Sequence, residues 1–319
     1  MRFLALLLCF SFVTPLLVRA QISANTLLET NLSITSQPEY PAPRETTHLS
    51  LNDYGGAVYG ASIEWYLNDK IIPGGTNKRS LDITVGDVGE VLVVEAILTR
   101  SDGSKATLSK TFDPLYVDVV VEPETHVPGF YTGRSLPSVG STVYLTALLD
   151  NGAPMDKDLV YLWKVNQTVL ENGPVRGRNR ISFVMPQDSY SVVSLQVAKP
   201  DGTILAKRST IVSATAPQIH FYEVNALYGT EVRSLNAFNM IGSGATLKAE
   251  PYYLDSQTFN NPNLLEWNID KNKVGGDSNN PYNITLEKTG YPGKSTLDFH
   301  VRNTTALLQG ARKSININI

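Results

Sequence analysis

One segment recurs three times in the chain, as Ile63-Glu64-Trp65-Tyr66-Leu67-Asn68, Tyr161-Leu162-Trp163-Lys164-Val165-Asn166 and Leu265-Glu266-Trp267-Asn268-Ile269-Asp270. The tryptophans are 98 and 104 residues apart. A repeat of about 100 residues has the size of one small β-sandwich domain. We therefore expect three tandem domains, at residues 26–113, 115–214 and 216–319. We expect the three tryptophans, Trp65, Trp163 and Trp267, to be structural core residues.

The chain around each tryptophan alternates apolar and polar residues with a period of two. In the middle repeat, such runs begin at Val117, Val143, Leu159 and Val193, and turn residues separate them. This alternation is typical of strands that bury one face, and helical periodicity is absent throughout. The sequence therefore predicts an all-β fold built from sandwiches.

The second and third repeats share a segment that the first lacks. Gly129–Leu136 and Ala226–Leu235 match in outline, and each follows a strand that ends at Glu122 or Glu223. We expect this segment to support the junction with the preceding domain. Short proline-containing linkers predict a semi-rigid rod of three units, because proline restricts the chain.

The block from Leu159 to Ser213 resembles the PKD and bacterial immunoglobulin-like superfamily. The resemblance rests on Tyr161–Asn166, Phe183-x-x-Pro186, Tyr190–Val197 and the Asp201-Gly202 turn. It recurs more weakly in the other repeats, and the Gly-Asp-Gly that usually follows the tryptophan strand of PKD domains is missing. The resemblance implies tandem immunoglobulin-like (PKD-like) β-sandwiches, and it implies surface display, adhesion, spacing or accessory binding in an envelope protein.

The first twenty residues have the pattern of an export signal. Arg2 precedes an apolar run from Phe3 to Val18, and Val18-Arg19-Ala20 resembles a cleavage site. We expect residues 1–20 to be a signal peptide, with an uncleaved membrane anchor as the alternative. Cleavage would remove Cys9, the only cysteine, so the mature chain would fold without disulfides.

The charge of the chain argues against a nucleic-acid partner. The formal net charge is −3 at pH 7, and removal of Arg2 and Arg19 would change it to −5. The largest basic cluster is Arg176-Gly177-Arg178-Asn179-Arg180. A nucleic-acid surface requires a larger basic patch, so we exclude such a partner.

Reactive residue types form no catalytic or cofactor-binding motif. The four histidines lie at least 78 residues apart, and no Gly-x-Ser-x-Gly is present. Oxygen-rich loops are candidates for calcium, because hard cations prefer carboxylate and amide oxygens. One candidate loop contains Asp150, Asp156 and Asp158, and the other contains Asp270, Asn272 and Asp277. Ordinary Asx turns are the alternative for both loops.

Together these observations predict a non-catalytic, secreted or cell-envelope protein. Its immunoglobulin-like domains would serve spacing, adhesion or protein–protein interaction. The expected partner is another envelope protein or a surface polymer. A carbohydrate-binding or appendage-associated accessory module is the alternative, and adjacent aromatic pairs such as Tyr252-Tyr253 and Phe221-Tyr222 would provide its stacking surface. An enzyme is disfavoured, because no catalytic constellation is present.

Overall fold

The computed structural model describes residues 32–56, 58–150, 157–288, 290, 292–306 and 308–319. The expected signal peptide at residues 1–20 lies outside this part. The regular secondary structure of the described chain is almost entirely strand, and its helix α2 (Ser256–Asn260) has five residues. The predicted all-β fold of tandem β-sandwiches is therefore confirmed. No helix in the described residues is long and apolar enough to cross a membrane.

The chain divides into two compact units. Strands β1 to β7 belong to the first unit, and strands β8 to β24 belong to the second. The second unit also includes the short segments Tyr40–Arg44 and Gly86–Glu90. The second and third repeats therefore form one compact unit.

The first sandwich consists of two antiparallel sheets with the strand orders β1-β2-β5 and β4-β3-β6-β7. Its core contains Trp65, Leu49, Val94 and Leu98, all of them fully buried. The strands are β1 (Leu32–Gln37), β2 (Thr46–Asp53), β3 (Ser62–Leu67), β4 (Lys70–Ile71), β5 (Ser80–Thr84), β6 (Leu92–Thr99) and β7 (Lys105–Phe112).

The second sandwich repeats this topology, with the sheet orders β13-β9-β8 and β11-β10-β14-β15, and β12 pairs with β10. Its core is built around Trp163, Leu145, Val193 and Leu195. The strands are β8 (Tyr116–Pro123), β9 (Thr142–Asp150), β10 (Val160–Val165), β11 (Thr168–Val169), β12 (Val175–Arg176), β13 (Arg180–Val184), β14 (Tyr190–Ala198) and β15 (Ile204–Ser213).

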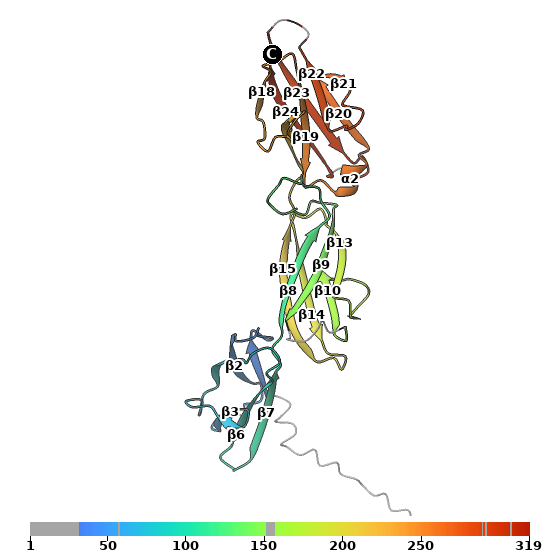
Figure 1. Ribbon diagram of the computed structural model, residues 1–319. Helices are drawn as coiled ribbons and strands as arrows, with labels where there is room; N and C mark the ends of the chain where they lie inside the picture. Colours follow the sequence, from blue (N-terminus) through green and yellow to red (C-terminus); the bar gives the residue numbers. More distant parts are fainter. Residues whose placement is uncertain (1–31, 57, 151–156, 289, 291, 307) are drawn as a thin grey trace, which may run out of the picture. The chain divides into compact units, whose positions relative to one another are not determined.

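The third sandwich has the sheet orders β17-β16-β19-β22 and β18-β24-β23-β20-β21 (Figure 1). The carboxy-terminal strand pairs with β23 on one side and with β18 on the other, so both of its edges are bonded within its own sheet. The strands are β16 (Gln218–Asn225), β17 (Gly229–Thr230), β18 (Ala237–Asn239), β19 (Gly244–Tyr252), β20 (Leu264–Ile269), β21 (Asn272–Val274), β22 (Asn283–Glu287), β23 (Lys294–Arg302) and β24 (Gly310–Asn318).

Each tryptophan lies at the centre of its sandwich and makes the same hydrogen bond. The side chains of Trp65, Trp163 and Trp267 are 0, 2 and 1% exposed. Each indole N–H donates to a backbone carbonyl in the crossing that leads to the opposite sheet; the acceptors are Lys78 at 2.9 Å, Arg178 at 3.0 Å and Pro281 at 2.9 Å. A buried indole needs such a partner, so this bond fixes the crossing in every repeat.

The residue three positions after each tryptophan closes a tight hairpin. Asn68, Asn166 and Asp270 have φ angles of 45, 47 and 49°, and the residue after each also has positive φ. Positive φ at both central residues is the signature of a type I′ turn, which matches the twist of the flanking strands. Their side-chain oxygens each accept a backbone N–H at 2.8 Å; the donors are Val93, Val192 and Thr296. This turn explains why every recurring segment ends in Asn or Asp.

Replacement of Asn166 tests the two contributions to this turn separately. Asn166→Ala loses the bond from Val192 and leaves a Cβ residue at positive φ, so we expect a loss of about 2 kcal/mol in the free energy of unfolding. Asn166→Gly also loses the side-chain bonds to Val192 and Ser191, but it leaves no Cβ at positive φ and should cost about 1 kcal/mol. Urea unfolding of residues 21–319 provides the measurement. Gln167→Gly, at φ 69°, is the control and should not destabilise. If Asn166→Ala and Asn166→Gly lose the same free energy of unfolding, backbone strain at this position does not contribute.

Candidate functional site

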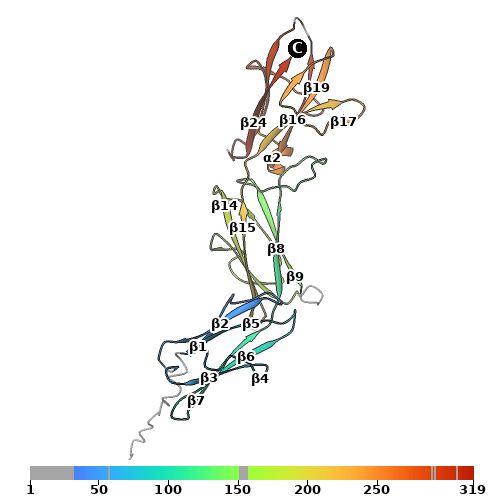
Figure 2. The same cartoon turned by 90° about the vertical axis from the view of Figure 1, so that its left-hand side faces the viewer.

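The second and third sandwiches are joined by paired backbone segments within the second unit. After β8, the chain leaves its own sheet, and Thr125 pairs with Asp255 in an antiparallel bridge. The N–H of His126 donates to the Leu254 carbonyl at 2.7 Å, and the N–H of Tyr253 donates to the His126 carbonyl at 2.8 Å. Figures 1 and 2 show this loop of the second sandwich at the end of the third sandwich that carries α2. We call this contact the junction.

A buried glutamine makes a second link at the junction. Gln309, from the turn before β24, is 1% exposed. Its amide nitrogen donates to Ser138 Oγ at 2.9 Å and to the Val139 carbonyl at 2.6 Å, and its oxygen accepts the Asp255 N–H at 2.9 Å. Asp255 is also the N-cap of α2. One amide side chain therefore ties the β8–β9 connection of the second sandwich to the start of that helix.

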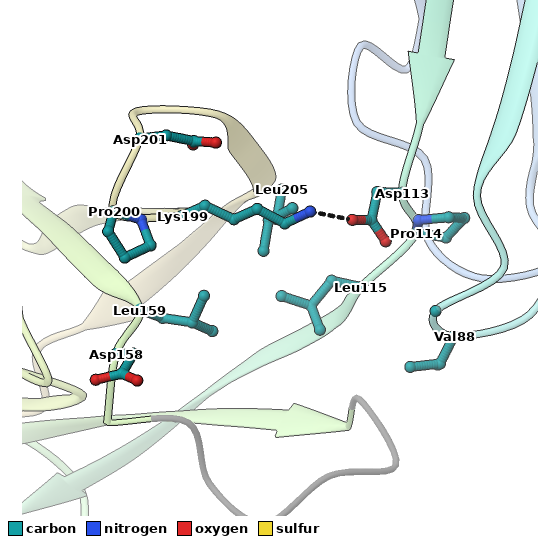
Figure 3. Close-up of a pocket in the computed structure, with 11 residues that line it drawn as sticks. Val88, Asp113, Pro114, Leu115, Asp158, Leu159, Lys199, Pro200, Asp201 and Leu205 are labelled. Carbon is teal, nitrogen blue, oxygen red and sulfur yellow. Dashed lines mark hydrogen bonds and ion pairs between the residues drawn. The ribbon is translucent and has the colours of Figure 1, made fainter.

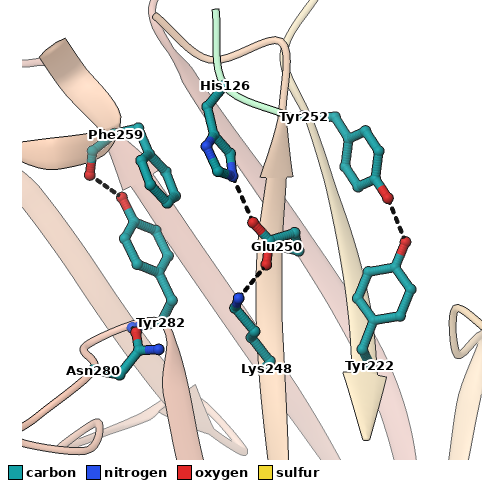
Figure 4. A network of polar contacts seen from close by, with 8 residues as sticks. All are labelled: His126, Tyr222, Lys248, Glu250, Tyr252, Phe259, Asn280 and Tyr282. Atoms are coloured by element: carbon teal, nitrogen blue, oxygen red, sulfur yellow. Dashed lines mark hydrogen bonds and ion pairs between the residues drawn. The ribbon is translucent and has the colours of Figure 1, made fainter. Parts of the chain in front are cut away.

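A buried carboxylate forms the charged centre of the junction (Figure 4). Glu250 on β19 is 1% exposed. One of its oxygens lies 2.5 Å from Nε2 of His126, and the other lies 2.5 Å from Nζ of Lys248. Burial by itself raises the pKa of Glu250, but the hydrogen bonds from His126 and Lys248 outweigh burial and hold the pKa below its ordinary value. Glu250 is therefore a buried carboxylate paired across the junction.

An aromatic stack fixes the imidazole of His126. Its ring lies parallel to that of Phe259 in α2, with the ring centroids 3.5 Å apart and an interplanar angle of 6°. Phe259 in turn stacks on Tyr282 at 4.7 Å, and the Tyr282 hydroxyl donates to the Phe259 carbonyl at 2.7 Å. The stack orients the imidazole toward Glu250, as Figure 4 shows.

Tyrosines form the apolar part of the junction. Tyr222, Tyr252 and Tyr253 are buried and pack against Phe130 and Tyr131 of the second sandwich. The hydroxyls are paired, Tyr222 with Tyr252 at 2.7 Å and Tyr131 with Tyr253 at 2.9 Å. Burial and then the bond to Tyr222 raise the pKa of Tyr252, and burial and then the bond to Tyr131 raise the pKa of Tyr253 to about 12. The hydroxyls of Tyr252 and Tyr253 are therefore neutral around pH 7.

Two expectations from the sequence change at this point. Gly129–Leu136 was expected to support the junction with the preceding domain, but its aromatic residues pack on the following sandwich. The pairs Tyr252-Tyr253 and Phe221-Tyr222 were considered as a stacking surface, but all four side chains are buried. A pocket of about 410 Å³ remains beside them, and Phe130, Tyr131, Tyr222 and Tyr252 are among its lining residues.

The calcium candidates of the second repeat are only partly described. Asp156 lies outside the described residues, and only the backbone of Asp150 is described, at the end of β9. Asp158 makes an ion pair with Arg176 at 2.6 Å. Asp158 also lines a pocket at the base of the second sandwich, where Lys199 lies 2.7 Å from Asp113 (Figure 3). The hydrogen bond that Lys199 donates to Asp113 raises the pKa of Lys199.

The calcium candidates of the third repeat all make hydrogen bonds within the protein. Asp270 accepts the Thr296 N–H, and Asp277 accepts the Asn279 N–H at 2.8 Å. Asn272 follows Asp270 and donates to its carbonyl at 3.5 Å. The described residues contain no group of three or more His, Cys, Asp or Glu side chains placed to hold a metal ion. Calcium binding stays a prediction, to be tested by unfolding with and without the ion.

Sequence reasoning missed the histidine and the carboxylate that pair across the junction. His126 stands alone in its local sequence, and Glu250 lies 124 residues further along the chain. Only α2 carried a local signal, because Asp255 precedes Ser256-Gln257-Thr258 and accepts the N–H groups of Gln257 and Thr258. An N-cap of this kind predicts the start of a helix.

No family model matches, and no curated protein matches. Similar solved structures include three N-terminal domains of the bacteriophage RB49 Highly Immunogenic Outer Capsid protein, which match at 12% identity over 90% of this chain and 98% of that chain, with a TM-score of 0.25.

Two further structures are similar at the same level. The central fibronectin-III array of RIM-binding protein matches at 13% identity over 90% of this chain and 96% of that chain, with a TM-score of 0.30. A Bacteroides ovatus protein of a mixed-linkage glucan utilization locus was solved with a heptasaccharide. It matches at 12% identity over 90% of this chain and 66% of that chain, with a TM-score of 0.25. At these values, no partner or activity transfers to this chain.

The buried carboxylate predicts a loss of stability in acid. The pKa of Glu250 is lowered in the folded state, so its stabilisation is complete above the ordinary value of 4.5 and is lost as the pH falls through the folded pKa. We expect Glu250→Gln to lower the free energy of unfolding at pH 6 by about 1–3 kcal/mol and to flatten the acid dependence. Urea unfolding between pH 6 and pH 3 measures both effects.

Glu287→Gln is the matched control, because Glu287 is exposed at the end of the neighbouring strand β22. This variant should keep the wild-type acid dependence. If the free energy of unfolding of Glu250→Gln falls with pH as it does in the wild type, this carboxylate does not couple the junction to pH.

Proposed function

We propose that this chain is a non-catalytic, extracytoplasmic protein that holds binding surfaces at a fixed spacing. The junction supports this proposal most directly, because two sandwiches share buried side chains and paired backbone there. Domains joined by flexible linkers lack such contacts and move independently. The proposal includes the domain limits 26–113, 115–214 and 216–319, a PKD-like subtype, and another envelope protein or a surface polymer as the partner.

A carbohydrate-binding role is the second candidate. The pocket beside the junction supports it, because aromatic rings from both sandwiches line it together with His220 and Gln218. Aromatic faces with nearby polar groups suit sugar rings. A glycan array probed with residues 21–319 tests this candidate. Binding that Tyr131→Ala abolishes would favour the pocket, and an array without signal would oppose it.

The spacing role predicts that the second and third sandwiches unfold together. In calorimetry of residues 21–319, we expect one shared transition for both. The double variant Tyr131→Ala, Gln309→Ala removes an aromatic contact and the buried amide, so the two sandwiches should separate into transitions about 5–10 °C apart.

Tyr228→Ala is the matched control for this experiment. Tyr228 occupies the position of Tyr131 in the matching segment of the third repeat, and its side chain is exposed. This variant should leave the calorimetric trace unchanged. Separate transitions of the second and third sandwiches in the wild-type chain would contradict a fixed spacing.

The extracytoplasmic location predicts a processed amino terminus. We expect the chain exported from a bacterial host to begin at Gln21, because Val18-Arg19-Ala20 has the small residues of a cleavage site. Amino-terminal sequencing and cell fractionation measure this. An intact segment 1–20 in the membrane fraction would support the anchor instead, and a full-length chain in the cytoplasm would contradict export.

A further inference from the structure

The end of the third sandwich opposite the junction exposes three large apolar side chains. Leu227 and Tyr228 follow β16 and are 84 and 86% exposed, and Ile241 between β18 and β19 is 96% exposed. We call these three residues the end patch. Exposed apolar side chains that cluster at one end of a domain often mark an interaction site.

The second sandwich shows what the equivalent residues contact. Phe130-Tyr131 corresponds to Leu227-Tyr228 in the matching segments of the two repeats. Val139 corresponds to Ile241, because each lies six residues before a fully buried leucine, Leu145 or Leu247, in the second strand of its sandwich.

In the second sandwich all three equivalents lie at the junction. Phe130 and Tyr131 pack on the tyrosines of the third sandwich, and the Val139 carbonyl accepts from Gln309. Val139 also lines a pocket together with Leu308 of the third sandwich. By this equivalence, the end patch should bind the amino-terminal end of an immunoglobulin-like sandwich, the end that contacts Phe130 and Tyr131 at the junction. We call this end the base.

The first sandwich carries such a receptor surface. Tyr252, which receives Tyr131 edge-on with the centroids 5.3 Å apart, lies five residues after the buried Leu247. Tyr54 lies five residues after the equivalent buried Leu49 and is 84% exposed. Tyr59 in the same β2–β3 connection is 89% exposed. We call Tyr54 and Tyr59 the base patch.

We propose that the chain self-associates head to tail, with the end patch of one molecule bound to the base patch of a second copy. The two patches are different surfaces, so the contact is heterologous. Each added molecule leaves one end patch and one base patch unoccupied, and the assembly grows as a linear chain unless it closes into a ring. This inference goes beyond the proposed spacing role and does not depend on it.

The contact between copies lacks the polar links of the junction. Asn52 occupies the position of Glu250, three residues after the buried leucine of its strand. A few apolar side chains bury less area than a standard interface, so association should be weak, with a dissociation constant on the order of 100 μM. Sedimentation velocity of residues 21–319 from about 10 μM to about 1 mM covers this range.

Two variants with one blocked surface each give the decisive test. The end-blocked variant carries Tyr228→Asp and Ile241→Asp, and the base-blocked variant carries Tyr54→Asp and Tyr59→Asp. Each should be monomeric alone. An equimolar mixture should form dimers and nothing larger, because only the intact base of the first variant can bind the intact end of the second.

Tyr190→Asp is the control, since Tyr190 is exposed on β14 of the second sandwich, which carries neither patch. It should associate like the wild type, and all variants should keep the wild-type circular dichroism and thermal unfolding. A wild-type chain that is monomeric at 1 mM would overturn the proposal. Association that survives in either blocked variant, or a mixture that stays monomeric, would overturn it as well.

Discussion

The hydrogen bond from each tryptophan indole to the backbone carbonyl 13 to 15 residues later is the constraint on which each sandwich depends. The described chain contains no cysteine, so no disulfide can join its sheets. Burial of the indole holds the two sheets together, and its N–H selects one path for the chain that crosses between them. Three residues later, a type I′ turn held by Asn68, Asn166 or Asp270 fixes the return strand. In all three repeats, the buried indole, its N–H bond and the bond accepted by the Asn or Asp of the turn therefore define the same geometry.

The junction uses polar groups differently. Removing Glu250 from water is costly, and its bonds with His126 and Lys248 offset that cost only where both partners are in place. An apolar contact of similar area would hold the two sandwiches together in several rotations, because it lacks directional bonds. The carboxylate, the Gln309 amide and the backbone bridge at Thr125 each specify a position. The tyrosine cluster supplies burial, and these directional bonds select the orientation.

The strands and turns could be predicted from the sequence because their signals are local. Alternation at Val117-Val119-Val121 corresponds to β8, and the Asp201-Gly202 turn links β14 and β15. The junction could not be predicted in this way. His126 and Glu250 are 124 residues apart, and each has an ordinary local sequence. The acidic loops show a related limit of local patterns, since Asp270 is a turn residue that accepts the Thr296 N–H. A local pattern does not distinguish a carboxylate that accepts backbone N–H groups from one that binds a metal.

Loop length explains why related segments behave differently in the two repeats. Val121 pairs with Leu145 in the same way as Glu223 pairs with Leu247, so the two strands have the same register. Tyr131 follows Val121 by ten residues, whereas Tyr228 follows Glu223 by only five. The five extra residues of the second repeat fall in the stretch that contains Thr125 and His126, the residues that bridge to the third sandwich. A short loop can present an aromatic side chain, but it cannot also extend a strand into a neighbouring domain. Within one chain, the longer loop gives a bonded junction, and the shorter loop leaves an apolar end suited to weak, reversible contact.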